Sequence, residues 1–387
     1  MPHLHHFAFA SLAALALVTA SCRAPGKSKA QGSPNHVFYP GPPASPRYQF
    51  LVGFGEEKDL RGDKGGFASF VVGEDPTSQA IIKPYGIAVQ DHTVHLCDTI
   101  AFAVDQVDLR TGKLHYFRPE GPGRLGKPIN LAIDADGTRY IADTAWGVVL
   151  IYGKDDRFLG SIGARGTTKP SDVVVQGNRL YIADLLEHGV KVLDKDSRQE
   201  LYRIPKEGES EEGQIFSPAN IAVGADGKVY VSDMGSFNVK IYAPDGRFLR
   251  RLGELGDHVG GMVRPKGVAV DRDGRVYVVD AATEVVQVFD AEGRLLVFFG
   301  ESAGSRGGLV LPAKVVIDYD HLEHFQRYAA PDFEVEYLLF VTSQYGPNKV
   351  SVFGFGHRRG ESTPPPARGP VTEQKSAPSA TASAKSP

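Results

Sequence analysis

The sequence predicts an all-β fold: a six-bladed β-propeller of four-stranded antiparallel blades, closed by an N-terminal strand that completes blade six. The first observation is a repeat. A proline followed by an apolar strand returns at residues 84, 128, 170, 218, 265 and 312, at intervals of 42 to 48 residues. Such a period indicates small units that bury apolar surface by stacking on one another. The second observation is that each repeat holds four strand-like segments separated by turn signals such as Asp-Gly.

The repeat that begins at Pro218 shows its elements most clearly. The expected strands are "NIAV" at 220–223, "KVYVSD" at 228–233, "VKIYA" at 239–243 and "FLRRLG" at 248–253. "ADG" and "PDGR" between them are typical of hairpin turns. The Pro265 repeat has the same order. The first strands of the six blades are therefore expected to begin near residues 86, 130, 172, 220, 267 and 314.

The two ends of the repeat region predict how the ring closes. The sixth repeat has its third strand at 350–355 and then lacks a fourth. The segment "YQFLVGFG" (48–55) precedes the first repeat and resembles an isolated fourth strand. Pairing these two segments would close the ring and protect both strand edges from further association.

The flanking segments do not have the composition of a folded domain. Phe7 to Val18 is an apolar run of signal-peptide length, followed by Thr19-Ala20-Ser21-Cys22, which resembles a bacterial lipoprotein cleavage box. We expect Cys22 to become the lipidated N-terminus; plain secretion is the alternative. The expected organisation is a signal peptide at 1–22, a Pro/Gly-rich tether at 23–46, the propeller at 47–357 and a disordered Pro/Ser/Ala-rich tail at 358–387.

The repeat motif also resembles a known family. Its order is Pro, a short gap, an apolar strand, Asp-Gly and then "VYV-x-D", which is similar to the NHL repeat family of six-bladed propellers over roughly residues 48–356. The resemblance implies the fold and leaves the function open, because propellers host enzymes, receptors and scaffolds. In five of the six blades an aspartate recurs at the end of strand two, and we predict that it accepts backbone N–H groups of the following turn. These residues are Asp98, Asp143, Asp184, Asp233 and Asp280.

The residue two positions after each blade proline is expected to face the central channel. Asn130, Asp172 and Asn220 would bring oxygen atoms of the kind that Ca²⁺ or Mg²⁺ prefers. This loosely resembles the metal site of gluconolactonase-like hydrolases, which also need a Glu; Glu56 and Glu57 are not fixed at the channel by the sequence. We therefore rank a divalent cation below a polar mouth with ordinary hydrogen bonds. The predicted mouth residues are Gly86, Asn130, Asp172, Asn220, Gly267 and Lys314.

Other candidate groups carry weaker signals. The lyase that cleaves peptidyl-hydroxyglycine is an NHL-type enzyme that holds zinc with several His, but His95, His115, His188 and His258 fall at different blade levels and should not converge. Cys97 takes a position where other blades have small buried residues, so we expect an inert thiol. No catalytic residue, nucleotide motif or haem motif is predicted.

Blade six contains an insertion at 319–335 that departs from the repeat. Leu322 and Phe325 share one helical face, which predicts either a short amphipathic helix packed under the blade or a docking surface. A metal site at Asp320, His321 and His324 is the weaker hypothesis.

Charge and export together suggest the function. The net charge is −3, and basic residues gather in 23–47 and 358–387, so the part between is net negative and disfavours nucleic acid. The leading hypothesis is a non-enzymatic, monomeric propeller scaffold, lipid-anchored to a bacterial envelope membrane, that binds a protein partner in an envelope or cell-surface complex. The alternatives are a metal-dependent hydrolase or lactonase acting at the channel mouth, and a propeller that binds a small ligand or glycan.

Overall fold

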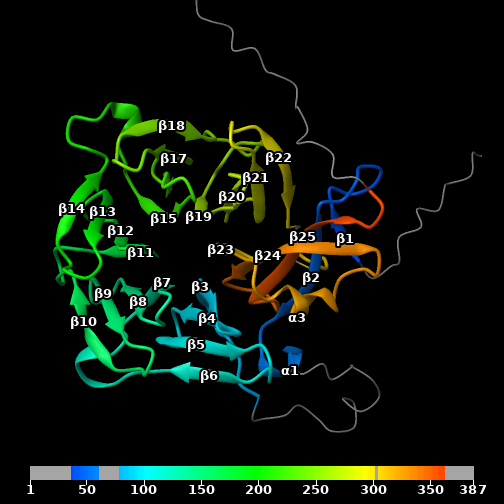
Figure 1. Cartoon of the computed structure of the whole chain (residues 1–387), viewed down its shortest axis with the longest axis horizontal. Coiled ribbons are helices and arrows are strands. Elements are labelled where there is room, and N and C mark those ends of the chain that lie inside the picture. The colour runs from blue at the N-terminus through cyan, green and yellow to red at the C-terminus, as the bar shows by residue number, and fades with distance from the viewer. Residues whose placement is uncertain (1–35, 61–77, 301–303, 362–387) are drawn as a thin grey trace, which may run out of the picture. The chain divides into compact units, whose positions relative to one another are not determined.

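The computed structural model describes residues 36–60, 78–300 and 304–361. They form six antiparallel sheets arranged as a ring, which confirms the predicted fold class (Figure 1). Five blades have four strands and the sixth has five. Within the described part of the chain, no helix has the length and apolar character needed to cross a membrane.

The first three blades follow the repeat directly. Blade one is β3 (Pro84–Gln90), β4 (Thr93–Asp98), β5 (Ala103–Asp108) and β6 (Leu114–Phe117). Blade two is β7 (Pro128–Ile133), β8 (Arg139–Asp143), β9 (Val148–Tyr152) and β10 (Phe158–Ile162), preceded by the 3-10 turn η1 (Gly121–Gly123). Blade three is β11 (Pro170–Gln176), β12 (Arg179–Asp184), β13 (Gly189–Asp194) and β14 (Glu200–Ile204).

The last three blades complete the ring. Blade four is β15 (Pro218–Val223), β16 (Val229–Asp233), β17 (Asn238–Tyr242) and β18 (Phe248–Leu252), after the 3-10 turn η2 (Glu211–Gly213). Blade five is β19 (Pro265–Val270), β20 (Val276–Asp280), β21 (Val285–Phe289) and β22 (Leu295–Phe299). Blade six is β23 (Pro312–Asp318), β24 (Phe333–Ser343), β25 (Val350–Arg358), β2 (Tyr48–Phe54) and β1 (Val37–Tyr39), in that spatial order.

The N-terminal strand closes the ring as predicted. β2 pairs antiparallel with β25, with Phe50 opposite Phe353 and Tyr48 opposite Phe355. The boundary at residue 47 needs correction, because β1 pairs with β2 and extends the sheet by a fifth strand. The ring of Tyr39 lies 6.1 Å from that of Phe299, so apolar contacts hold this part of the expected tether against the blade. β25 also continues to Arg358, into the expected tail. The signal peptide, Cys22 and residues 362–387 lie outside the described residues.

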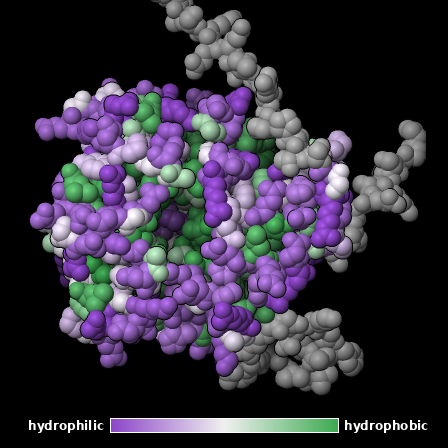
Figure 2. Space-filling model, in the orientation of Figure 1, coloured by the Kyte–Doolittle hydropathy of each residue, from purple (hydrophilic) through white to green (hydrophobic). Residues whose placement is uncertain are grey.

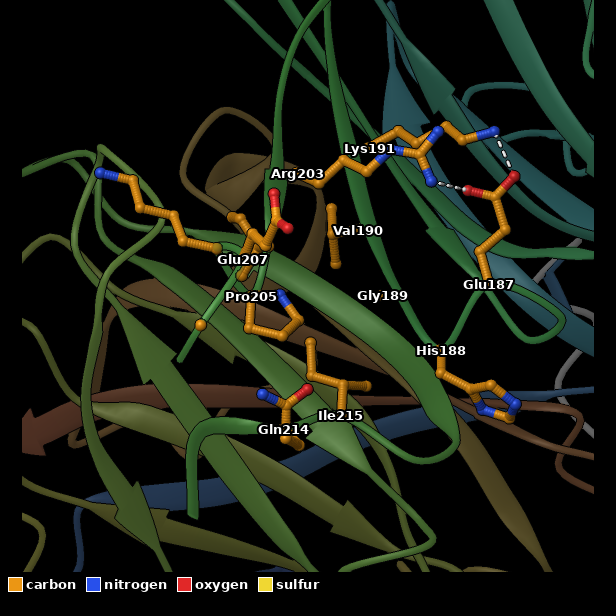
Figure 3. A pocket seen from close by; sticks show the side chains of 13 residues that line it. Glu187, His188, Gly189, Val190, Lys191, Arg203, Pro205, Glu207, Gln214 and Ile215 are labelled. Carbon is orange, nitrogen blue, oxygen red and sulfur yellow. Dashed lines mark hydrogen bonds and ion pairs between the residues drawn. The ribbon is translucent and has the colours of Figure 1, made fainter. Parts of the chain in front are cut away.

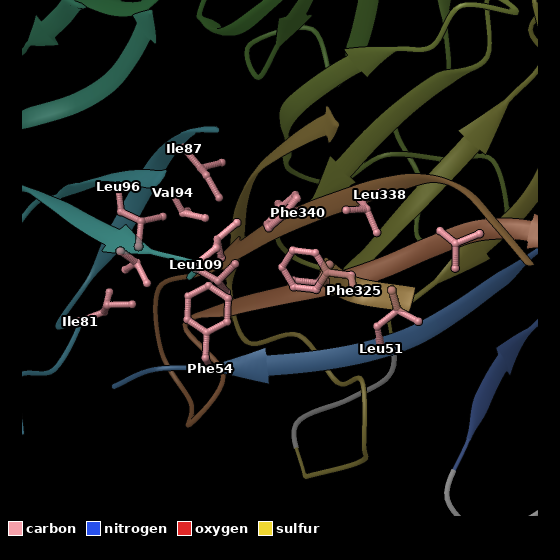
Figure 4. Close-up of a cluster of buried hydrophobic side chains, with 14 of the residues drawn as sticks. Leu51, Phe54, Ile81, Ile87, Val94, Leu96, Leu109, Phe325, Leu338 and Phe340 are labelled. Atoms are coloured by element: carbon pink, nitrogen blue, oxygen red, sulfur yellow. The ribbon is translucent and has the colours of Figure 1, made fainter. Parts of the chain in front are cut away.

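Apolar side chains fill the space between neighbouring blades. One cluster joins blade six to blade one and includes Leu51, Phe54 and Phe340 (Figure 4). The short helix α3 (Leu322–Gln326) inserts Phe325 into the same cluster, where it is fully buried. The 319–335 insertion therefore contains the expected amphipathic helix, packed onto its own blade. Cys97 is also fully buried between blades one and two, and burial raises the pKa of its thiol well above the ordinary value.

His321 in this insertion has both ring nitrogens occupied. Its Nδ1 lies 2.7 Å from Asp318 Oδ2, and its Nε2 accepts the backbone N–H of His92 at 3.1 Å. This arrangement ties the blade-one turn to blade six and uses the atoms that a metal would need. Among the residues that the structure describes, no group of three or more His, Cys, Asp or Glu could hold a metal ion.

The recurrent aspartates hold two loops each. Asp98 accepts the N–H groups of Ile100 and Ala101 in the turn after β4, as predicted. Its other carboxylate oxygen accepts the backbone N–H groups of Ile82 and Lys83, in the loop that leads into β3. The sequence did not indicate this second set of bonds. Asp143, Asp184, Asp233 and Asp280 make both kinds of bond. We call the surface formed by these two sets of loops the loop face.

The residue seven positions after this aspartate differs from blade to blade. In blade four it is Lys240, whose ammonium lies 2.9 Å from Asp233. In blade one it is Asp105, which is fully buried beside Asp98 with neither carboxyl oxygen hydrogen-bonded. Burial, and then the neighbouring Asp98 charge, raise the pKa of Asp105 to about 9. The Asp105 carboxyl is therefore neutral in the folded protein at pH 7.

This carboxyl gives a pH-dependent contribution to stability. Because its folded pKa lies above its unfolded value, the contribution is complete below about pH 4 and is lost as the pH rises through 9. Asp105→Asn has no proton to lose and should flatten this decline, with a gain at pH 8 of at least about 1.4 kcal/mol, the equivalent of one pKa unit. Denaturant unfolding between pH 5 and 9 measures this. Asp196→Asn, at an exposed turn, is the control, and an unchanged slope in Asp105→Asn would contradict the assignment.

Candidate functional site

The six predicted mouth residues are all buried around the axis of the ring, at the start of the innermost strands. The space-filling view shows a hollow at the centre of the ring, with hydrophilic side chains at depth (Figure 2). The structure thus brings the predicted set together. It also assigns the members different roles.

A buried ion pair crosses the axis. Lys314 Nζ lies 2.5 Å from Asp172 Oδ2, although these residues belong to opposite blades, six and three. The Asp172 carboxylate also accepts the N–H groups of Val173 and Ile221, each at 2.9 Å. Burial raises the pKa of Asp172, and the Lys314 ammonium opposes that shift. Lys314 therefore places a positive charge where a cation bound to Asp172 would lie.

The two glycines serve the packing of the blades. A Cβ atom on Gly86 would lie 2.5 Å from the Cα of Asn130 in the next blade. A Cβ on Gly267 would lie 2.7 Å from the Cα of Lys314. Real Cβ atoms do not approach backbone so closely, so both positions need glycine whether or not a ligand binds.

Side-chain hydrogen bonds join other neighbouring blades around the axis. Asn130 Nδ2 donates to the Ser171 carbonyl and Ser171 Oγ to the Pro218 carbonyl, each at 2.7 Å. Thr342 Oγ1 donates to the Tyr85 carbonyl at 2.7 Å and so links blade six to blade one. These contacts fix the first strands, and hence the mouth, without a ligand.

Two amide oxygens at the mouth remain unused. Asn130 Oδ1 and Asn220 Oδ1 are buried without a hydrogen-bond partner. They flank Asp172 in the ring order and are the atoms that a cation would require. The Glu that gluconolactonase-like enzymes add is not supplied by Glu57, whose Oε1 accepts the N–H of Leu114 in the outermost strand of blade one. The donor set therefore fits a hard cation only in part.

Sequence reasoning missed Lys266, which directly follows Pro265. Lys266 is 4% exposed, and its ammonium forms no hydrogen bond or ion pair with the described residues; its Nζ lies 5.0 Å from the ring centre of Tyr85, two blades further on. Burial, and then the charges of Arg264 and Lys83, lower the pKa of Lys266 to about 8. The sequence pattern led us to expect only the second residue after each proline to face the channel. In the structure, the pairing of β19 with β20 shifts between Pro265 and Val268, and the first residue after the proline, Lys266, is buried as well.

The loop face differs from the rest of the surface. Its loops hold most of the exposed large hydrophobic side chains among the described residues: Ile82, Ile100, Phe102, Leu186, Phe216, Leu255, Val259 and Tyr345. The others, Leu159, Leu201, Leu249 and Phe298, lie on the outermost strands. No described turn on the opposite face contributes one.

The loop face also carries cations without ion pairs. The residue before the blade proline is basic in four blades, namely Lys83, Lys127, Lys169 and Arg264, and none of them forms an ion pair with a described residue. The opposite face has paired lysines, as in Lys195–Asp134 at 2.5 Å and Lys228–Asp226 at 2.6 Å. It also has exposed cations, such as Arg110, Lys113 and Arg247, that pair with no acidic group of the described residues. A net-negative domain thus carries unpaired positive charge around one end of its channel.

A cleft of about 280 Å³ lies between blades three and four (Figure 3). Three of its charged groups bind one another: Glu187 contacts Lys191 at 2.5 Å and Arg203 at 2.7 Å. This internal pairing makes the cleft a weaker candidate than the channel mouth.

Comparisons with known proteins support the fold. No family model matches the chain, and no curated protein matches its sequence, so the NHL assignment stays a resemblance. Among solved structures, a protein of unknown function from Bacteroides thetaiotaomicron is 16% identical, with TM-score 0.54, covering 80% of this chain and 75% of that chain. A gluconolactonase from Xanthomonas campestris is 17% identical, with TM-score 0.50, covering 71% and 87%. At these identities, the likeness shows the six-bladed propeller fold alone.

Proposed function

We propose that this protein is an exported, membrane-tethered propeller that binds the acidic surface of a protein partner through its loop face. The observation that carries the proposal is the one-sided distribution of exposed apolar side chains. Soluble monomers rarely gather such groups on one face unless the face binds something. The outermost strands and the opposite turns supply the contrast within the same molecule.

The charge of the loop face supports an acidic partner. Lys127, Lys169 and Arg264 are exposed around one end of the channel, and none of them forms an ion pair with a described residue. Charge complementarity of this kind increases association rates and excludes partners of like charge. The same loops have rigid backbones, because buried aspartates hold them, so little ordering is needed on binding.

The tether is a separate part of the proposal and rests on the sequence. A lipid on Cys22 would hold the propeller near a membrane, and several acyl chains on one residue give firm retention where a single chain would not.

A metal-dependent hydrolase is the second candidate. The unpaired oxygens of Asn130 and Asn220 favour it, and the Lys314 ammonium on Asp172 opposes it.

Photo-crosslinking tests the docking face. A crosslinking residue in place of Phe102 or Phe216, in cells that express the full chain, should give one discrete adduct, and the same residue in place of Leu201 or Phe298 should not. Lys127→Glu combined with Lys169→Glu should reduce the adduct at least tenfold, whereas Lys154→Glu with Lys228→Glu, on the opposite face, should leave it unchanged. The proposal would be refuted if the loop-face positions and the outermost-strand positions gave equal amounts of adduct. It would also be refuted if charge reversal on the loop face left the adduct unchanged.

Detergent partitioning tests the tether. Cys22→Ala should move the protein from the detergent phase to the aqueous phase, because it removes the acylated residue. Cys97→Ala changes a buried thiol and is the matched control. Unchanged partitioning of Cys22→Ala would show that lipid on this residue does not hold the protein.

Thermal melting tests the metal-dependent candidate. A cation that binds only the folded state at a hundredfold excess over Kd would add about 2.7 kcal/mol of stability. We expect no shift with Ca²⁺, Mg²⁺, Mn²⁺ or Zn²⁺, because Lys314 already neutralises Asp172. A shift that Asp172→Asn abolishes would reverse the order of the two candidate functions.

A further inference from the structure

We propose that the channel mouth contains a carboxylate-binding site centred on Lys266, with Arg264 and Lys83 around it. Among the described residues, none forms a hydrogen bond or ion pair with the Lys266 ammonium. The site takes a carboxylate group that approaches along the axis from the loop face.

The first argument is the missing counter-charge. Buried charges in proteins are nearly always paired, because removing an ion from water is costly. Lys314 shows the usual solution, with a carboxylate at 2.5 Å. Lys266 is equally buried and has only the face of the Tyr85 ring, at 5.0 Å. A cation over an aromatic ring gains much less interaction energy than an ion pair does. The contact with Tyr85 therefore does not offset the cost of burying the Lys266 ammonium.

The second argument is the positive charge of the residues around Lys266. Arg264 and Lys83 lie close enough to lower the pKa of the Lys266 ammonium. The Lys83 ammonium donates to the Tyr345 hydroxyl at 2.8 Å and pairs with no acidic side chain of the described residues. Three cations that repel one another without a balancing group destabilise the folded state, and an anion among them would reverse the sign of that interaction.

The charge balance selects the class of ligand. The Lys314–Asp172 pair at the axis is neutral as a unit, so the buried part of the mouth has one uncompensated charge, that of Lys266. One carboxylate balances this charge, and further carboxylates of the same ligand would meet Arg264 and Lys83 nearer the surface. The ligand is therefore a polycarboxylate. It is either a small free molecule or an acidic segment of the docked partner, and only the second source rests on the proposed function.

Titration calorimetry at low ionic strength and pH 7 tests the site with two probes. Citrate represents a small polycarboxylate, and an end-blocked tetraglutamate peptide represents an acidic segment; inorganic phosphate is the comparison anion. At least one carboxylate probe should bind, and Lys266→Met should weaken it at least tenfold. Lys228→Met, on the opposite face, should bind as the parent does. Arg264→Gln offers a second variant at an exposed position and should weaken binding severalfold.

The outcomes separate the two sources. Citrate binding alone indicates a free ligand, and peptide binding alone indicates a partner segment; both outcomes support the site. If neither probe binds at millimolar concentration, or if Lys266→Met and Arg264→Gln bind as the parent does, the site is refuted. An adduct from the loop face that persists in Lys266→Met would keep the docking proposal while excluding a role for this lysine in it.

Discussion

The pairing of β2 with β25 is the constraint on which the rest of the structure depends. It joins residues about three hundred positions apart, and until it forms, blades one and six each lack a neighbour for one apolar surface. Side chains from both ends then meet in a single aromatic group, in which Tyr48 stacks on Phe299 with ring centres 5.1 Å apart. The inner strands encircle one axis only in the closed ring, so the ion pair between opposite blades, Lys314 and Asp172, requires this closure.

The buried aspartates explain how one scaffold can carry a specialised face. Each carboxylate accepts N–H groups from two loops, so the loop backbones are held from beneath. Each loop that leads into a first strand buries one apolar side chain, such as Ile81, Ile215 or Met262, and the exposed side chains of the same loops remain available for binding. Exposed hydrophobic groups accumulate on this face, whereas no described turn of the opposite face carries a large one.

Two lysines at the axis differ in whether the protein itself neutralises their charge. Lys314 is neutralised within the protein, and removing either partner would leave a buried charge without compensation, which commonly costs several kcal/mol. Lys266 has no such partner among the described residues, and burial lowers the pKa of its ammonium to about 8, which makes its charged form costly. Proteins tolerate such strain chiefly where it serves binding or catalysis. At the channel mouth, an unpaired buried lysine is unfavourable for folding but suited to binding an anion.

The sequence by itself determined the blade count, the strand order, the ring closure and one of the two roles of the repeated aspartates. The blade count and strand order depend on local patterns that recur along the chain, so each copy reinforces the others, and the closure follows from the two ends of that repeat. The sequence also located the mouth residues, because they occupy one position in every repeat. Tertiary structure decided what those residues do: the bulge after each proline brings Lys266 to the axis, closure brings Lys314 to Asp172, and blade packing requires glycine at 86 and 267. It also placed Val37–Tyr39 on the sheet, since three residues carry too little pattern to predict a strand until the aromatic surface that receives them exists.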